Sequence, residues 1–328
     1  MILAGDVGGT STRLGFFTIE DRRLNLVLEK DYPSRQHKSL VEIVVEFVSH
    51  HRVAIEYACF GVAGPVQHGR VETPNLPWVV DQETIARELR IDSGWLINDL
   101  LANTYGIRAL EDKDFVVLNA GSSNPIGNAA VISAGTGLGE AGSYWDGSRY
   151  HPFACEGGHS DFAPRSELEI DLLKYLIEKF GHASWERVVS GPGLHNIFDF
   201  LRDTGRSEAP AWLTDEMREK DPSAVISQAA LEGKSELCVH ALDMFISCFG
   251  AEAGNLALKF LATGGVFVGG GIAPKIIQKL SEKTFVDAFT DKGRFKHVLE
   301  SIPVRVILND KTALLGAARC AARRASLI

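Results

Sequence analysis

The first part of the chain alternates short apolar runs with tight turns, which is the pattern of paired strands. The runs are Met1–Val7, Arg13–Ile19 and Leu24–Tyr32, and Gly8-Gly9 ends the first of them. Strands joined by connections this short pair antiparallel. We therefore expect an antiparallel meander at the start of the chain.

Beyond the meander, helical and strand-like patterns follow one another. Apolar residues recur every three or four positions from Leu40 to Phe47, which predicts a helix. Asp81 is placed to cap a later helix, because its carboxylate can accept from the unpaired N–H groups of the first turn. The pattern predicts strand, helix, strand and helix in turn over Ile55–Val62, Gln82–Leu89, Trp95–Asn98 and Leu100–Leu110.

The second half repeats this alternation on a larger scale. A strand-rich stretch covers Phe115–Trp145, and Ser166-x-x-Glu169 has the form of a capping box that opens a helix to about Phe180. Strand groups separated by helices predict an α/β protein with two lobes. Gly193–Gly264 has a mostly helical pattern, and Val266–Val268 has the pattern of a strand. Thr312–Arg324 has the alanine-rich composition of a helix.

Length and charge exclude several classes of protein. The 328 residues suffice for two domains, because single cores stop growing near ~250–300 residues. The formal net charge of −8 disfavours partners rich in phosphate, so we expect neither nucleic-acid nor membrane-surface binding. The uncharged stretches are broken by Gly, Asn, Ser and Pro short of the ~18 apolar residues that a membrane span needs.

The cysteines and the N-terminus point to the cytoplasm. The five cysteines are an odd number, and no two lie closer than ten residues, which excludes CxxC redox and zinc patterns. We interpret them as buried reduced thiols of a cytoplasmic protein. The chain opens directly on the first apolar run without a basic segment, so the sequence predicts no signal peptide.

Glycine is the residue in excess, with 32 of 328 positions against a usual ~7%. The first glycine motif, Gly5–Arg13, has a carboxylate at a strand end followed by two glycines, a hydroxyl and a guanidinium. Gly8 and Gly9 would let backbone N–H groups approach phosphate oxygens, and Thr10 would add a hydroxyl donor. Asp6 could orient Mg²⁺ directly or through water, while Arg13 could oppose phosphate charge. An ordinary hairpin turn is the alternative.

Two further glycine motifs follow strand patterns. Gly135-Thr136-Gly137 and Gly269-Gly270-Gly271 each read alone as a tight turn, and each can also face a nucleotide. The spacing Gly137-x-Gly139-x-x-Gly142 matches a dinucleotide fingerprint. That fingerprint must open a helix, whereas this segment continues as strand, so we exclude a Rossmann site.

Acidic, amide and imidazole side chains form the remaining set. Asp99 comes directly after Asn98, at the end of an apolar strand. There it could bind a hydroxylated ligand together with Asn98 and accept a hydroxyl proton, or simply cap the next helix. Glu156 and His159 flank two glycines, in a turn that could line a cavity, lie on the surface or form half a metal site. Glu186 alone would be a solvated charge. Together these acceptors suit a sugar, whose hydroxyls each need a partner.

Taken in order over nearly the whole chain, these motifs resemble the bacterial-type glucokinase family of the actin-like ATPase (hexokinase) superfamily. The segments that carry the resemblance are Gly5–Thr10, Ile97–Asp99, Ala134–Gly139, Glu156–His159 with Asp161–Pro164, Glu186–Val188 with Ser190–Leu194, Gly265–Pro274 and Asp291–Phe295. Related kinases of the repressor–open-reading-frame–kinase (ROK) family carry a cysteine-rich zinc segment after the equivalent histidine. This chain has Ser160–Pro164 there, which places it in the zinc-free branch.

The resemblance implies an α/β fold of the two-domain actin-like ATPase (ribonuclease H-like) type with an interdomain cleft. The expected domains are a small one of residues 1–109 and 309–328, a large one of residues 110–308, and the expected assembly is a homodimer. Asp99 is implied as the catalytic base, with sugar ligands Asn98, Asp99, Glu156, His159, Glu186 and Asn75. The expected nucleotide-binding residues, from motifs and resemblance together, are Asp6, Gly8, Gly9, Thr10, Arg13, Gly135, Thr136, Gly137, Gly269, Gly270 and Gly271.

The predicted function is phosphorylation of the 6-hydroxyl of glucose by ATP, with Mg²⁺ as the metal and Asp99 accepting the hydroxyl proton. Three alternatives remain open from the sequence. One is a kinase for another hexose or an amino sugar, because the acceptors do not separate glucose from mannose. A second is a non-catalytic sugar sensor, and a third is an actin-like assembly ATPase.

Overall fold

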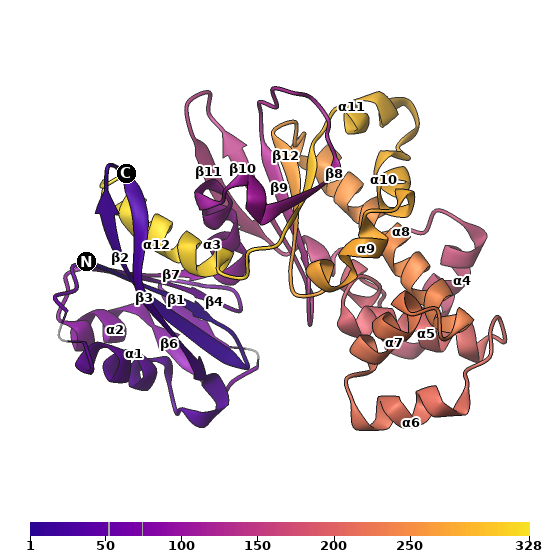
Figure 1. Ribbon diagram of the computed structural model, residues 1–328, viewed down its shortest axis with the longest axis horizontal. Helices are drawn as coiled ribbons and strands as arrows, with labels where there is room; N and C mark the ends of the chain where they lie inside the picture. The colour runs from indigo at the N-terminus through magenta and orange to yellow at the C-terminus, as the bar shows by residue number, and fades with distance from the viewer. Residues whose placement is uncertain (52, 74) are drawn as a thin grey trace. The chain divides into compact units, whose positions relative to one another are not determined.

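The computed structural model describes residues 1–51, 53–73 and 75–328, which form two compact units (Figure 1). The first unit comprises Met1–Asp114, Pro152–Ala154 and Asn309–Ile328, and the second comprises Phe115–His151 and Cys155–Leu308. Each unit has its own sheet and its own buried apolar clusters.

The first unit is built on a five-stranded sheet of order β3-β2-β1-β4-β7. Its first three strands pair antiparallel, which confirms the predicted meander, and β1, β4 and β7 run parallel. A separate hairpin joins β5 (Arg70–Glu72) to β6 (Val79–Asp81). The sheet strands are β1 (Ile2–Val7), β2 (Ser11–Glu20), β3 (Arg23–Pro33), β4 (Tyr57–Val62) and β7 (Gly94–Asn98).

Helices cover both faces of this sheet (Figure 1). The helix α1 (Leu40–Ser49) buries the predicted apolar stripe on one face, beside α2 (Gln82–Leu89). Asp81 caps α2 as predicted, since its Oδ1 accepts from the Thr84 N–H at 2.8 Å. The other face is covered by α3 (Asp99–Gly106) and the C-terminal α12 (Thr312–Arg324).

The second unit is built on a six-stranded mixed sheet of order β11-β10-β9-β12-β13-β8. The central strands β9, β12 and β13 are parallel, while β10 pairs antiparallel to β9 and β8 pairs antiparallel to β13. The strands are β8 (Phe115–Asn119), β9 (Ala129–Ala134), β10 (Leu138–Trp145), β11 (Tyr150–Cys155), β12 (Gly265–Gly269) and β13 (Val304–Ile307). The segment after Gly137 is therefore a strand, as the exclusion of a Rossmann site required.

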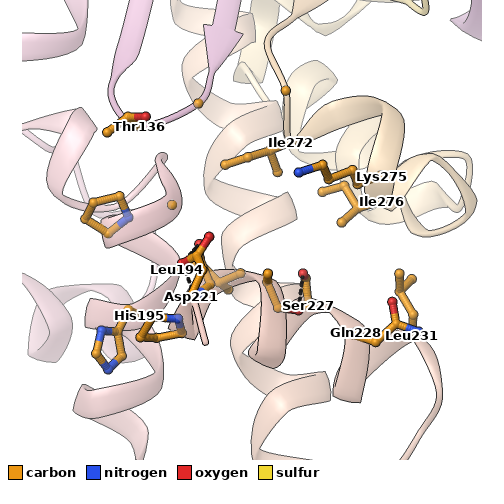
Figure 2. A pocket seen from close by; sticks show the side chains of 17 residues that line it. Thr136, Leu194, His195, Asp221, Ser227, Gln228, Leu231, Ile272, Lys275 and Ile276 are labelled. Carbon is orange, nitrogen blue, oxygen red and sulfur yellow. Dashed lines mark hydrogen bonds between the residues drawn. The ribbon is translucent and has the colours of Figure 1, made fainter. Parts of the chain in front are cut away.

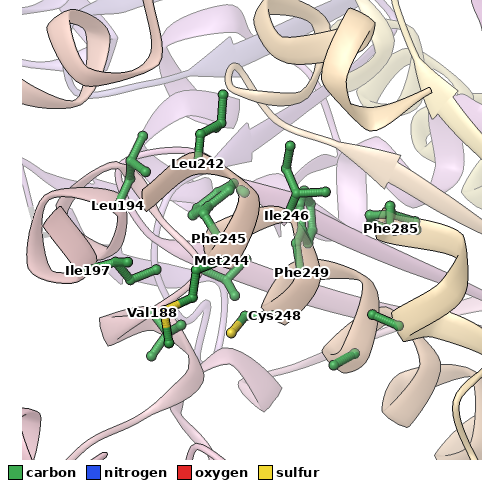
Figure 3. Packing of buried hydrophobic residues seen from close by; sticks show 14 of the residues in the cluster. Val188, Leu194, Ile197, Leu242, Met244, Phe245, Ile246, Cys248, Phe249 and Phe285 are labelled. Carbon is green, nitrogen blue, oxygen red and sulfur yellow. The ribbon is translucent and has the colours of Figure 1, made fainter. Parts of the chain in front are cut away.

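A long helix, α8 (Glu236–Phe260), forms the centre of the second unit's apolar core (Figure 3). Phe245 and Phe249 lie within it, and Phe249 contacts the ring of Phe285 edge-on. The other helices are α4 (Glu167–Phe180), α5 (Gly191–Asp203), α6 (Ala211–Glu219), α7 (Pro222–Leu231), α9 (Ile277–Leu280), α10 (Lys283–Thr290) and α11 (Lys296–Glu300).

By length and composition alone, α8 could cross a membrane. However, 78% of its most apolar stretch is buried inside the structure. The apolar character of this helix is therefore explained by the core that it forms.

Two helix ends differ from the predictions. The helix α3 ends at Gly106 and continues as a 3₁₀ turn, Ile107–Ala109, instead of running to Leu110. Ser166 caps α4, but Glu169 accepts from the N–H of Arg165 at 2.6 Å, so the reciprocal half of the capping box is displaced by one residue.

Candidate active site

The carboxyl ends of the three parallel strands in the first unit lie level with one another. In the strand register Asp6 pairs with Gly61, and Gly61 pairs with Ile97. The turn at Gly8-Gly9 and the residues Asn98-Asp99 therefore emerge at the same edge of the sheet. In open α/β sheets this edge is where ligands bind.

The Gly8–Thr10 turn is held by Ser34, from the 3₁₀ helix η1 (Ser34–Gln36). The Ser34 hydroxyl donates to the Gly8 carbonyl at 2.8 Å, and its backbone N–H donates to the Thr10 carbonyl at 3.0 Å. The Thr12 hydroxyl lies 2.9 Å from the same Ser34 oxygen. Ser34 was not among the predicted residues, because a lone serine after a strand carries no motif.

Asn75 lies against this turn. A Cβ atom at position 9 would come within 2.7 Å of the Asn75 Cβ, so only glycine fits between them. The structure thus brings Asn75 beside the Gly8-Gly9 turn within the first unit.

Asp6 lies among charged side chains at the end of β1. Burial, and then the nearby Asp99, raise its pKa to about 6, and Arg13 acts in the opposite direction. An enclosed carboxylate beside other carboxylates gains from a cation. Magnesium typically takes one or two carboxylates and completes its shell with water and phosphate oxygens. Asp6 therefore fits a magnesium ligand, directly or through water.

Arg13 is held by two carboxylates from distant parts of the sequence. Its Nε donates to Asp31 at 2.8 Å, and its Nη2 donates to the carboxylate of Asp310 at 3.1 Å. These partners, Asp31 foremost, raise the pKa of the guanidinium. The charge that the sequence assigned to phosphate is thus already balanced within the first unit, and neither carboxylate was predicted.

Asn98 and Asp99 share the start of α3. Asn98 is the cap: its Oδ1 accepts from Leu100 and Leu101 at 2.9 and 3.2 Å, and its Nδ2 donates to the Gly64 carbonyl at 3.2 Å. Asp99 is the first helical residue, and its Oδ1 accepts from the Leu100 N–H at 2.9 Å. The helix-capping role considered for Asp99 therefore belongs chiefly to its neighbour.

In the second unit, two glycine turns converge at the carboxyl ends of β9 and β12. The Gly135 N–H donates to the Gly137 carbonyl at 2.8 Å. The Gly135 carbonyl accepts from the N–H of Gly191, at the start of α5, also at 2.8 Å. Gly270 has φ +88° and lies directly on the backbone of Ala134, where a Cβ would collide. Close backbone packing therefore explains the glycine at position 270, whereas a Cβ at Gly135 would meet open space.

A cavity of about 860 Å³ opens between these turns and the helices of the second unit (Figure 2). Leu194, Leu231, Ile272 and Ile276 give it apolar walls, among polar groups from the start of α7 and from Lys275. Its size is within the range of small-molecule sites. The polar residues that line it are Thr136, His195, Asp221, Ser223, Ser227, Gln228 and Lys275.

The Glu156–His159 turn is also in the second unit, as the 3₁₀ helix η4 (Gly157–His159) with Glu156 just before it. His159 Nδ1 lies 4.0 Å from Glu186 Oε1, and the other oxygen of Glu186 accepts from the Leu138 N–H at 3.0 Å. Glu186 belongs to the 3₁₀ helix η5 (Trp185–Arg187), so it is not the solvated helix charge that it resembled. The structure thus gathers the acidic and imidazole candidates of this unit around the start of β10.

One buried acid in this region was missed. Glu140 of β10 is 1% exposed and lies beneath Gly157, where a Cβ would collide with its carboxyl group. The available signal was a lone glutamate in an otherwise uncharged strand. Among the residues that the structure describes, no group of three or more His, Cys, Asp or Glu could hold a metal ion.

Comparison with known proteins decides the family. The glucokinase family model matches residues 3–324. The chain belongs to the glucokinase family. A Nostoc species has a glucokinase 43% identical over 339 residues, covering 98% of this chain and 99% of the relative, and a Synechocystis glucokinase is 42% identical over 98% of both.

The solved structures agree with the fold. A glucokinase from an Antarctic psychrotroph superposes with a TM-score of 0.87 at 30% identity, covering 98% of both chains. The family resemblance and the two-domain α/β fold of the actin-like type are therefore confirmed, and so is the prediction of an enzyme of the glucose kinase class.

Proposed function

We propose that the protein transfers the γ-phosphoryl group of ATP to the 6-hydroxyl of glucose. The observation that carries the proposal is the position of Asp99, at the carboxyl end of β7 and close enough to Asp6 to raise its pKa. Two similar structures favour these substrates. One is a Balamuthia mandrillaris glucokinase in complex with glucose, with a TM-score of 0.81 at 22% identity. The other is a Streptomyces griseus ROK-family glucokinase with glucose and AMPPNP, with a TM-score of 0.61 at 20% identity.

In the proposed reaction Asp99 accepts the proton of the sugar hydroxyl as its oxygen attacks phosphorus. The helix start supports this role, because the Leu100 N–H holds one carboxylate oxygen in place. A positioned general base contributes roughly 10²–10⁴-fold to a rate. Positioning and charge stabilisation supply most of the remainder in phosphoryl transfer, whose transition state is loose.

We assign the sugar contacts to polar side-chain atoms that can form further hydrogen bonds. Asn98 donates one amide hydrogen to Gly64, and its second amide hydrogen can go to a sugar oxygen. Glu156, His159 and Glu186 supply acceptors and an imidazole from the second unit. Asn75, beside Gly9, is proposed as a further sugar contact.

The nucleotide contacts divide between phosphate turns and a cavity. We assign the phosphates to Gly8, Gly9 and Thr10 of the first unit and to the Gly135–Gly137 and Gly269–Gly271 turns of the second. The apolar walls of the 860 Å³ cavity suit the flat face of a purine ring. Magnesium bound near Asp6 would neutralise phosphate charge.

Arg13 takes a modified role in this proposal. Because Asp31 and Asp310 already bind its guanidinium, Arg13 interacts chiefly with carboxylates of the protein and not with the phosphates of ATP. It offsets three neighbouring carboxylates and so keeps Asp6 ionised at neutral pH. A direct phosphate contact would have to compete with both ion pairs.

The remaining features are proposals of the same kind. We propose a cytoplasmic homodimer with a small domain of residues 1–109 and 309–328 and a large domain of residues 110–308. An ADP-release assay across a panel of hexoses and amino sugars tests the substrate. Glucose should give the highest kcat/KM, whereas a higher value for another sugar would overturn the glucose assignment. Absence of sugar-dependent ADP release would overturn the kinase assignment itself.

A further inference from the structure

Glu140 is a buried acid that the proposed reaction does not use. It lies on β10 with 1% of its surface exposed, and among the described residues neither carboxyl oxygen has a well-formed hydrogen bond. A buried polar group normally has a partner, and a buried charge is costly without one. This side chain therefore calls for a specific explanation.

The group that faces it is a second buried acid. Glu252 of α8 is fully buried, and its carboxylate accepts from Lys259 Nζ at 3.0 Å and from Asn255 Nδ2 at 2.8 Å. Lys259 brings one positive charge to the two acids. Burial, and then Glu252, raise the pKa of Glu140 to about 8, and Lys259 lowers it. At neutral pH Glu140 is thus a neutral acid.

Other titratable groups face this pair from each side. Cys155 at the end of β11 is influenced by both Glu140 and Glu156, and its pKa is raised chiefly by burial. Lys292 donates to Asn255 Oδ1 at 2.7 Å, and burial lowers its pKa to about 8. Any pH effect of Glu140 must therefore be separated from that of Lys292.

The position of Glu140 connects it to the sugar turn. The α-carbon of Gly157 lies directly on the Glu140 carboxyl group, and Gly158 lies on the backbone carbonyl of Leu138. Two residues of β10 therefore form the support of the turn between Glu156 and His159. A second buried negative charge beside Glu252 would draw in water or push this support apart.

We propose that Glu140, in its protonated form, is a positioning residue that holds the Glu156–His159 turn in the geometry that binds the sugar. This inference rests on the proposed function. The neutral acid supports the turn, and the ionised acid releases it. Sugar affinity is then constant while Glu140 is protonated and falls as pH rises through the pKa of Glu140.

The test compares Glu140→Gln with the wild-type protein between pH 7 and pH 9. Glutamine has the shape of the neutral acid and cannot ionise. For one titrating group near pH 8, the wild-type KM for glucose should rise about tenfold over this range while kcat at saturating glucose changes much less. Glu140→Gln should keep the KM of the wild type at pH 7 and remain flat to pH 9. Glu140→Ala, verified as folded by circular dichroism, should have a raised KM at every pH.

A rise in KM for Glu140→Gln as steep as that of the wild type would overturn the proposal and assign the effect to another group such as Lys292. A wild-type KM for a folded Glu140→Ala would also overturn it. A readout without substrate separates this failure from failure of the proposed function. The amide resonances of Gly157 and Gly158 should shift near pH 8 in the wild type and stay fixed in Glu140→Gln, whichever sugar the protein uses.

Discussion

The carboxylate of Glu186 accepts a hydrogen bond from the backbone N–H of Leu138, 3.0 Å away. Leu138 follows the Gly135–Gly137 turn, and the second oxygen of Glu186 lies 4.0 Å from His159 Nδ1. The α-carbon of Gly137 is so close that a Cβ there would lie 2.5 Å from Glu186 Oε2. A single side chain thus touches both the proposed phosphate turn and the proposed sugar site.

This arrangement predicts different effects for two substitutions of Glu186. Glu186→Ala removes the acceptor of Leu138 and should raise the KM values for both glucose and ATP about tenfold or more, since hydrogen bonds to charged groups contribute ~1.5–3 kcal/mol. Glu186→Gln keeps an acceptor oxygen for Leu138 and should raise the glucose KM while leaving the ATP KM within about twofold. Initial-rate measurements with each substrate varied check this. An unchanged ATP KM for Glu186→Ala would refute the link.

Ser34 should stabilise the first unit through the Gly8–Thr10 turn. Ser34→Ala leaves the Gly8 carbonyl and the Thr12 hydroxyl without their partner, and an unsatisfied buried group costs ~1–3 kcal/mol. We expect a loss of that size in the free energy of unfolding, together with a raised KM for ATP. The matched control is Ser49→Ala on α1, where an exposed hydroxyl donates to the Glu46 carbonyl at 2.9 Å. Urea denaturation should separate the two variants, and equal losses would contradict this role.

Arg13 should set the acid limit of activity through Asp6. The pKa of Asp6 is raised to about 6 from an ordinary 3.8, so the carboxylate is present above about pH 6 and is lost as pH falls. Without Arg13 this pKa should rise further, because Asp99, Asp31 and Asp310 would act on Asp6 unopposed. The acid limb of kcat/KM for ATP, which reports the free enzyme, should then move to higher pH in Arg13→Met.

The control for that shift is Arg218→Met, which removes an exposed arginine paired with Asp215 in α6. Its acid limb should coincide with that of the wild type. An unshifted profile for Arg13→Met would show that Asp6 does not control the acid limit.

The parts of the fold that sequence predicted are those fixed by local pattern. The meander, the apolar stripe of α1 and the Asp81 cap each depend on residues close together in the chain. The strand after Gly137 was predicted for the same reason, because Ser143-Tyr144-Trp145 favours strand over helix.

The contacts that were missed join distant positions. Arg13 meets Asp310 across 297 residues, and Ser34 meets Gly8 only because β3 returns beside β2. Glu140 and Glu252 face each other across the interior of the second unit. Such pairings follow from tertiary packing, so the hydrophobic periodicity of the sequence does not predict them. The local pattern also did not identify the cap of α3. Two adjacent side chains, Asn98 and Asp99, could cap this helix, and Asn98 is the residue that does so.

Asp99 is proposed to accept the proton of the sugar hydroxyl, and the Asp99→Asn variant isolates that role. The variant keeps a side-chain oxygen for the Leu100 N–H, so glucose binding by isothermal titration calorimetry should stay close to that of the wild type. Its kcat should fall by roughly 10²–10⁴. Asp92→Asn, at an exposed position before β7, is the matched control and should keep full activity. Near-normal turnover of Asp99→Asn with glucose bound would show that Asp99 is not the general base.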